Sequence, residues 1–117
     1  MHGLWRLPAS AVLLVVCGVA HAAEPFIGRW AINPVGCTID GDTSETAPLV
    51  ATATTIKWFV ASCKIAKMYK TGSAVHIQAR CSAEGQVSMT PITLDARGDR
   101  MRVTWDGSKV EDMRRCK

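Results

Sequence analysis

The sequence predicts an all-β fold, a small antiparallel up-and-down barrel of seven or eight strands, with a β-sandwich as the alternative. The first supporting observation is a set of residue-glycine pairs that punctuate the C-terminal half: Thr71-Gly72, Glu84-Gly85, Arg97-Gly98 and Asp106-Gly107. Such pairs favour hairpin turns, because glycine adopts positive φ without steric cost. The second is that apolar and polar residues alternate between these pairs, whereas no stretch beyond residue 22 has helical periodicity.

The three later turns predict strand registers that agree with one another. The expected apolar pairs are Ile77–Ile92 and Val75–Leu94 about Glu84-Gly85, Ile92–Val103 and Leu94–Met101 about Arg97-Gly98, and Val103–Val110 about Asp106-Gly107. The last turn also sets Arg102 opposite Glu111 on the other face. Because a slip of one residue would turn a strand's side chains to the opposite face, this agreement favours a meander of neighbouring strands.

Some residues interrupt the pattern. Lys67 would face inward opposite Ile77 if its hairpin folds symmetrically, so a β-bulge near Lys67 or a slip of one residue is expected. Val87 and Met89 are out of phase with the apolar residues that follow. Pro91 lacks a backbone N–H, which favours a bulge or a sheet edge at that point.

The N-terminal half is less regular. Apolar residues alternate from Phe26 to Ile32, and Asn33-Pro34 ends this strand. The remaining expected elements are a polar loop over 38–46, a strand over Leu49–Thr52, and one long or two short strands over Ile56–Tyr69. With this many short strands, a closed barrel is favoured because closure leaves no exposed edge.

Residues 1–22 are expected to be a secretory signal peptide, which leaves a single domain over 23–117. Arg6 supplies a positive start, residues 11–20 are apolar, and Ala20-His21-Ala22 is a small-x-small cleavage site. The apolar run is too short for a membrane-spanning helix. A lipoprotein anchored at Cys17 is the alternative, although Val16 stands where a small residue is usual. The short leader looks bacterial, which predicts a periplasmic or secreted protein.

The predicted mature chain keeps four cysteines, Cys37, Cys63, Cys81 and Cys116. An even number in a small exported domain favours two disulfides, and the lack of a closely spaced cysteine pair argues against a zinc site. If a hairpin folds about Gly72, Cys63 lies directly opposite Cys81 at a separation that a disulfide can span. Cys37 is then left to pair with Cys116.

Composition and charge exclude several classes of function. The chain has 117 residues, of which 48% are hydrophobic and 21% charged, which is typical of one folded soluble domain. Its net charge is +4 and falls by one, to +3, when Arg6 leaves with the signal peptide, too small a surplus for a nucleic-acid-binding protein. We interpret the basic residues of the middle hairpin and the tail as solvated, with a patch for acidic polymers or membrane surfaces as the alternative: Lys57, Lys64, Lys67, Lys70, Arg80, Arg114, Arg115 and Lys117.

The opening of the predicted domain resembles that of small secreted β-barrels. Gly28-Arg29-Trp30-Ala31-Ile32 carries a G-x-W similar to that of lipocalins, and the Gly36-Cys37 that follows adds a resemblance to Inh-type inhibitors of secreted bacterial metalloproteases. The resemblance implies an eight-stranded barrel with Trp30 plugging one end. The inhibitor pattern also implies one disulfide, here Cys37–Cys63, and an N-terminal trunk longer than Ala23–Ile27.

Catalytic and metal-binding arrangements find little support. His76 is expected on the outer face opposite Met68, and the cysteines that could act with it belong to the expected disulfides. An acidic loop offers oxygen ligands at alternate positions, but it lacks the spacing of a calcium loop and is interpreted as solvated: Asp40, Asp42, Ser44 and Glu45. We therefore expect no enzyme, no cofactor and no metal.

These observations predict a non-enzymatic exported binding protein of the bacterial envelope. The expected partner is a protein of the periplasm or medium, for example a hydrolase that is inhibited by protein–protein contact, and neither nucleic acid nor a membrane span is expected. The alternative is a small-ligand carrier that binds near Trp30 and Trp58 at the barrel mouth. A tryptophan-lined cavity would favour the carrier, whereas a filled interior with an exposed loop of apolar and charged residues would favour the binding protein.

Overall fold

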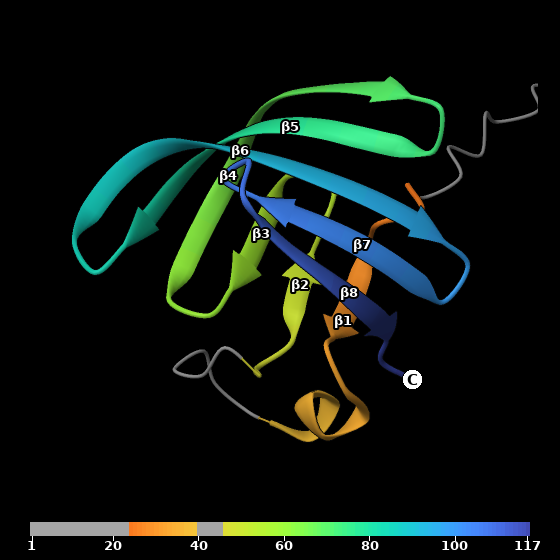
Figure 1. The fold of residues 1–117 in the computed structure, drawn as a ribbon. Coiled ribbons are helices and arrows are strands. Elements are labelled where there is room, and N and C mark those ends of the chain that lie inside the picture. Colours follow the sequence, from red (N-terminus) through yellow and green to blue (C-terminus); the bar gives the residue numbers. More distant parts are fainter. Residues whose placement is uncertain (1–23, 40–45) are drawn as a thin grey trace, which may run out of the picture.

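A computed structural model describes residues 24–39 and 46–117, so the expected signal peptide and the whole acidic loop, Asp40, Asp42, Ser44 and Glu45, lie outside the described residues. Eight strands close into an antiparallel barrel in which each pairs with its neighbours in sequence and β8 pairs with β1 (Figure 1). The elements are β1 (Gly28–Ala31), a 3-10 helix η1 (Pro34–Thr38), β2 (Leu49–Ala51), β3 (Thr55–Trp58), β4 (Ala61–Thr71), β5 (Ala74–Ala83), β6 (Gln86–Arg97), β7 (Arg100–Trp105) and β8 (Lys109–Arg115). The predicted barrel is therefore confirmed.

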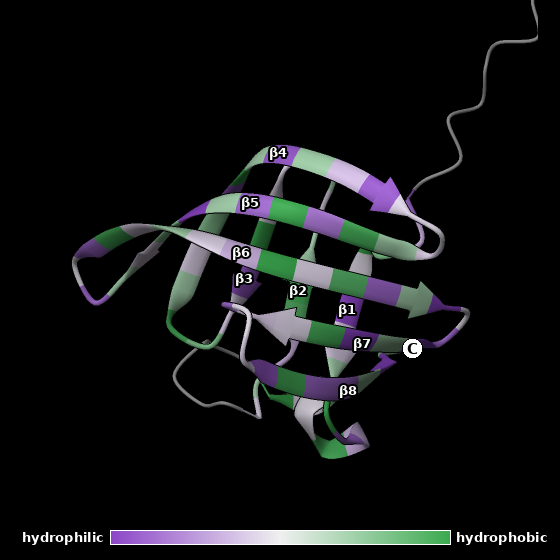
Figure 2. Ribbon diagram, turned by 45° about the horizontal axis from the view of Figure 1, so that its top comes forward, coloured by the Kyte–Doolittle hydropathy of each residue, from purple (hydrophilic) through white to green (hydrophobic). Residues whose placement is uncertain are grey.

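The core lies inside the barrel because successive residues of each strand point to opposite faces. Figure 2 shows hydrophobic and hydrophilic residues alternating along β5, β6 and β7. Inward-facing Ile77, Leu94 and Val103 are buried, and they belong to one continuous cluster that also contains Trp30 and Trp58. Among residues 24–39 and 46–117, no helix is long and apolar enough to cross a membrane.

The hairpin of β4 and β5 confirms the predicted β-bulge. Its register shifts between Ile65 and Lys67, which turns Lys67 outward, opposite Gln78. The same shift places His76 opposite Tyr69, so the expected pairing of His76 with Met68 is wrong. The extra residue of the bulge changes the face of every β4 residue that follows it.

The hairpin of β5 and β6 has the predicted register, with Ile77 opposite Ile92. No register shift occurs between these strands, so a bulge at Pro91 is wrong. Pro91 instead lies just past the end of β7, where its carbonyl accepts a hydrogen bond from the backbone N–H of Asp106. Beyond this point, Val87 and Met89 of β6 extend past β7 and are exposed.

The last two hairpins differ from their predicted registers. β6 and β7 turn at Gly98-Asp99, one position later than expected, so Leu94 faces Val103 and the inward face is preserved. β7 and β8 are joined by three residues, and Val103 faces Glu111 rather than Val110. Val110 is consequently exposed. Met113, opposite Met101, is the residue of β8 that enters the core.

The same three-residue loop changes the outer face of this hairpin. Arg102 faces Asp112, so its predicted pairing with Glu111 is wrong. A loop one residue longer than expected moves every β8 residue by one position relative to β7. Arg102 is therefore opposite an acidic residue on the outer face, but that residue is Asp112, with which it forms an ion pair.

Both predicted disulfides are confirmed. Cys63 and Cys81 are directly opposite on β4 and β5, and their bond closes a sequence separation of 18 residues. Cys37 of η1 bonds to Cys116, just after β8, across 79 residues. The Cys37–Cys63 pairing of the inhibitor pattern is thus absent, and the long bridge joins the first and last parts of the barrel.

Candidate functional site

Trp30 closes the end of the barrel at which β1 begins and β8 ends, here called the Trp30 end. Its side chain is 0% exposed, and its Nε1 donates a hydrogen bond of 2.9 Å to the carbonyl of Phe26. The Arg115 guanidinium lies 4.2 Å from the ring centroid and donates to the carbonyls of Ile27 and Pro25, each at 2.9 Å. A tryptophan fixed on so many sides acts as a structural plug.

Trp58 occupies the opposite end, at which β3 and β7 end, here called the Trp58 end. It is 4% exposed and packs edge-on against Trp105, with 5.3 Å between ring centroids. The Lys109 ammonium lies 5.0 Å from the Trp58 ring, and the Trp58 Nε1 has no hydrogen-bond partner among residues 24–39 and 46–117. Both predicted binding tryptophans are therefore core residues, and neither lines the two concavities described next.

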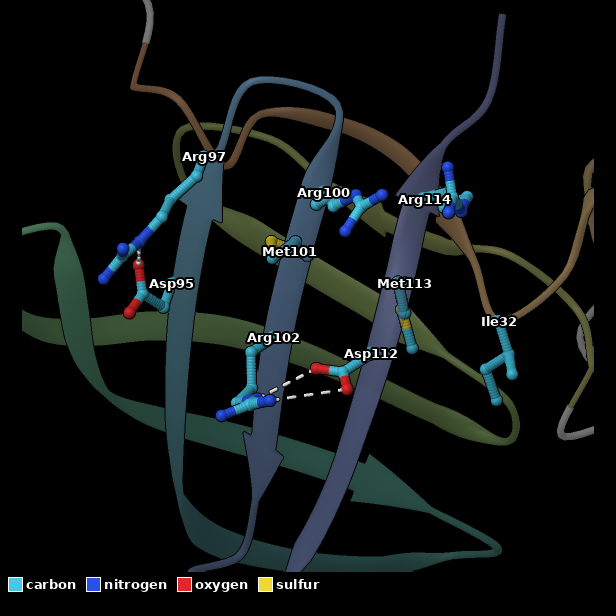
Figure 3. Close-up of a pocket in the computed structure, with 9 residues that line it drawn as sticks. All are labelled: Ile32, Asp95, Arg97, Arg100, Met101, Arg102, Asp112, Met113 and Arg114. Atoms are coloured by element: carbon cyan, nitrogen blue, oxygen red, sulfur yellow. Dashed lines mark hydrogen bonds and ion pairs between the residues drawn. The ribbon is translucent and has the colours of Figure 1, made fainter.

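The larger concavity, about 470 Å³, lies over β6, β7 and β8 (Figure 3). It is lined by Ile32, Asp95, Arg97, Arg100, Met101, Arg102, Asp112, Met113 and Arg114. A second, of about 120 Å³, lies at the Trp30 end beside an ion pair of 2.6 Å between Lys70 and Glu24. The larger one contains four arginines and two aspartates, which makes it the more strongly charged of the two.

Strand register arranges these charges in two rows. Arg100 of β7 lies opposite both Arg97 of β6 and Arg114 of β8, so three arginines lie side by side across neighbouring strands (Figure 3). We call these three the arginine row. Two residues further along β7, Arg102 lies between Asp95 and Asp112, which we call the mixed row.

The charges of the mixed row are compensated by contacts within the protein. Arg102 Nε donates to one oxygen of Asp112 at 2.9 Å, and its Nη2 lies 3.4 Å from the other. This hydrogen bond lowers the pKa of Asp112 below its ordinary value. A hydrogen bond from Ser73, followed by one from Arg97, lowers the pKa of Asp95 in the same direction. Both carboxylates are thus held in their charged forms by partners within the protein.

The arginine row has far less internal compensation. Arg97 reaches Asp95 at 3.4 Å through an exposed contact, whereas Arg100 and Arg114 make no ion pair with the described residues. Like charges directly opposite on neighbouring strands destabilise a sheet. The row therefore combines uncompensated positive charge with a hollow that exposes it.

A second exposed feature is the projecting part of the β5–β6 hairpin. Val87 and Met89 point outward and are 59% and 54% exposed. They lie opposite Ser82 and Arg80, and Arg80 in turn lies opposite Lys64 on β4. Apolar and basic side chains thus share one outer face, although this mixed surface lies on strands rather than on the loop that was expected for a binding protein.

His76 lies on the outer face, as predicted, and both of its ring nitrogens have neighbours. Nε2 lies 2.6 Å from the hydroxyl of Thr71, and Nδ1 lies 3.3 Å from that of Thr93. Its ring stacks on Tyr69 with 4.8 Å between centroids. These contacts fix the imidazole against β4 and β6, away from the arginine row.

Sequence reasoning placed only Arg114 of the arginine row in a basic group, and it assigned that group to the solvated surface. The row depends on the register of β6 with β7 and on that of β7 with β8. Both registers were predicted with an offset. In the comparisons with known proteins, no family, no curated protein and no solved structure matches this chain.

Proposed function

We propose that this chain is a non-enzymatic binding protein that contacts a protein partner through the outer face of the β5–β6 hairpin. The observation that carries the proposal is the contrast between a barrel interior occupied by one continuous cluster and the exposed Val87 and Met89. An eight-stranded barrel is just wide enough for side chains to fill. Apolar side chains left outside such a barrel, beside basic ones, are available for contact with another protein.

Export to the periplasm or medium is part of the proposal. Two disulfides are typical of proteins from oxidising compartments, and the first 22 residues have the pattern of a signal peptide. The resemblance of the opening strand to Inh-type inhibitors favours a secreted hydrolase as the partner.

The contact is assigned to the hairpin rather than to the segment before β1. Phe26 is buried, and the carbonyl of Pro25 accepts a hydrogen bond from Arg115. A segment packed in this way would first have to leave the barrel before it could enter a hydrolase cleft. The hairpin needs no such rearrangement, since Met89 is already exposed.

A photo-crosslinking amino acid at position 89 of the exported protein tests this proposal. We expect one discrete cross-linked protein at position 89 and none at position 35. Position 35 is the control, because Val35 on η1 is also apolar and exposed but lies on another face. Val87→Ser in the same chain should reduce the yield at position 89. Equal products at both positions would contradict the proposal. Native mass spectra that show an organic molecule inside the barrel would favour the small-ligand carrier instead.

A further inference from the structure

We propose that the arginine row is a binding site for a phosphoryl group, carried either by a small soluble molecule or by a lipid headgroup. This inference does not depend on the proposed function, since it concerns a different face of the barrel. It rests on the position, charge and surroundings of Arg97, Arg100 and Arg114.

The first argument is geometric. Neighbouring strands lie about 4.8 Å apart, so guanidinium groups on β7 and β8 start from adjacent positions and can converge on one tetrahedral anion. Arg100 and Arg114 are directly opposite, and Arg97 follows on the other side of Arg100. The planar fork of arginine matches the oxygens of a phosphoryl group and binds two of them at once.

The second argument is charge. The hollow contains four arginines and two aspartates, which leaves a surplus of +2. Both aspartates already have partners, Asp112 with Arg102 and Asp95 with Arg97 and Ser73. A phosphoryl dianion would match the surplus and would relieve the repulsion between Arg100 and Arg114.

The third argument is shape. The hollow is about 470 Å³, within the range of about 300–1,000 Å³ that is usual for small-molecule sites. A phosphoryl group on the arginine row leaves room for the moiety that carries it. Ile32, on the rim, offers that moiety one apolar contact.

The competing interpretation is that these arginines are only solvated surface charges. The barrel provides an internal control, because Lys64 and Arg80 are also like charges directly opposite on neighbouring strands. That pair lines neither of the two concavities. The proposal therefore requires the two pairs to differ in phosphate binding, whereas simple surface charge would make them alike.

The test compares two double variants that each lose two positive charges, Arg100→Gln with Arg114→Gln and Lys64→Gln with Arg80→Gln. Phosphate binding is measured by isothermal titration at constant ionic strength, with chloride as the reference salt. We expect wild type and the second variant to bind inorganic phosphate, and the first variant to bind at least about tenfold more weakly, since two charge-assisted contacts are lost. Both variants are expected to fold, because each removes a repulsive pair.

Two results would overturn the proposal. One is equal phosphate affinity in the two double variants, which would indicate diffuse charge. The other is a wild-type protein that responds to phosphate no more than to chloride at equal ionic strength. A melting temperature raised by phosphate in wild type, but not in Arg100→Gln with Arg114→Gln, would support the site independently.

A second measurement distinguishes the two sources of the phosphoryl group. Wild type is sedimented with phosphatidylcholine vesicles that contain phosphatidic acid or, at equal surface charge, oleate. Retention on phosphatidic acid alone, reversed by inorganic phosphate, would assign the site to a lipid headgroup. Phosphate binding without vesicle retention would assign it to a soluble phosphate. Equal retention on both vesicle types, unaffected by Arg100→Gln with Arg114→Gln, would contradict the proposal.

Discussion

The two ends of the barrel are closed with the same kinds of group, a buried tryptophan, a cation over its ring and a nearby disulfide, yet they are held very differently. At the Trp30 end, the indole N–H is hydrogen-bonded and the cation is an arginine fixed by two backbone carbonyls. At the Trp58 end, the indole N–H has no hydrogen-bond partner in the part of the chain that the structure describes, and the cation is a lysine, Lys109.

The difference follows from which parts of the chain meet at each end. Arg115 contacts residues almost ninety positions earlier, so the Trp30 end joins the two extremes of the barrel. Trp58, Trp105 and Lys109 lie at the ends of hairpins that are already held by their own backbone hydrogen bonds. Closure of the barrel therefore depends on the Trp30 end. The residues at the Trp58 end cover a core that the hairpins have already formed.

The largest expected effect concerns the disulfides. Replacing Cys37 and Cys116 by alanine should lower the free energy of unfolding by about 4–5 kcal/mol, and replacing Cys63 and Cys81 by about 3 kcal/mol, because the longer loop restricts the unfolded chain more. Urea melts of the two double variants measure the difference. A larger loss from the Cys63–Cys81 pair would contradict the assignment of closure to the Trp30 end.

The next effect compares the two cations. Arg115→Ala should cost about 2–4 kcal/mol, because it removes charge-assisted hydrogen bonds and uncovers Trp30. Lys109→Ala should cost about 1 kcal/mol or less. Arg115→Lys keeps the charge and serves as the control. It should recover only part of the loss, since an ammonium lacks the guanidinium fork. Thermal unfolding of the three variants would refute the comparison if the alanine variants were equal.

A smaller effect concerns two glycines. A Cβ added to Gly28 would lie 2.6 Å from the Arg115 guanidinium, which its own hydrogen bonds prevent from moving away. Gly28→Ala should therefore cost about 2–3 kcal/mol. A Cβ added to Gly85, in the turn that leads to β6, would meet no atom within 4 Å. Both glycines have a positive φ, so the two substitutions differ in the contact with Arg115. Gly85→Ala should cost only about 1 kcal/mol. Equal losses in chemical denaturation would show that the contact with Arg115 is unimportant.

The smallest effect isolates one hydrogen bond. Trp30→Phe and Trp58→Phe remove the same atoms from two buried sites, so their cavity costs are similar. Trp30→Phe also leaves the Phe26 carbonyl without its donor, whereas Trp58→Phe removes an N–H that has no partner. We expect Trp30→Phe to be the less stable by about 1–2 kcal/mol in urea melts. The reverse order would mean that Trp58 has a partner in solution.

The sequence alone predicted the Cys63–Cys81 disulfide because that inference depends on local symmetry, whereas Cys37–Cys116 followed as the remaining pair and the barrel followed from the number of short strands. Gly72 lies midway between Cys63 and Cys81, and any tight turn there brings the two cysteines together. The bulge was also foreseen, since Lys67 could not remain inward opposite an isoleucine. Patterns of this kind are visible in a single hairpin and need no information about the rest of the chain.

The last hairpin could not be predicted in the same way. The Asp106-Gly107 pair is compatible with loops of two or three residues, and the longer loop turns Lys109 and Glu111 inward, which an alternation rule rejects. The barrel tolerates these residues because they lie near the Trp58 end, where Lys109 covers Trp58. The arginine row was missed for the same reason, since its three members meet only in the observed registers.

The bulge between Ile65 and Lys67 divides β4 into two parts of opposite parity. Odd-numbered residues such as Cys63 face inward before it, and even-numbered ones such as Met68 face inward after it. Ala66 is the residue of β4 without a partner on β5, so deleting it would remove the bulge and leave Lys67 opposite Gln78 and Met68 opposite Ile77 in one regular alternation. Loop insertions at Gly72 would also leave these pairs intact, so β4 accepts changes of length at two places, the bulge and the tip of its hairpin.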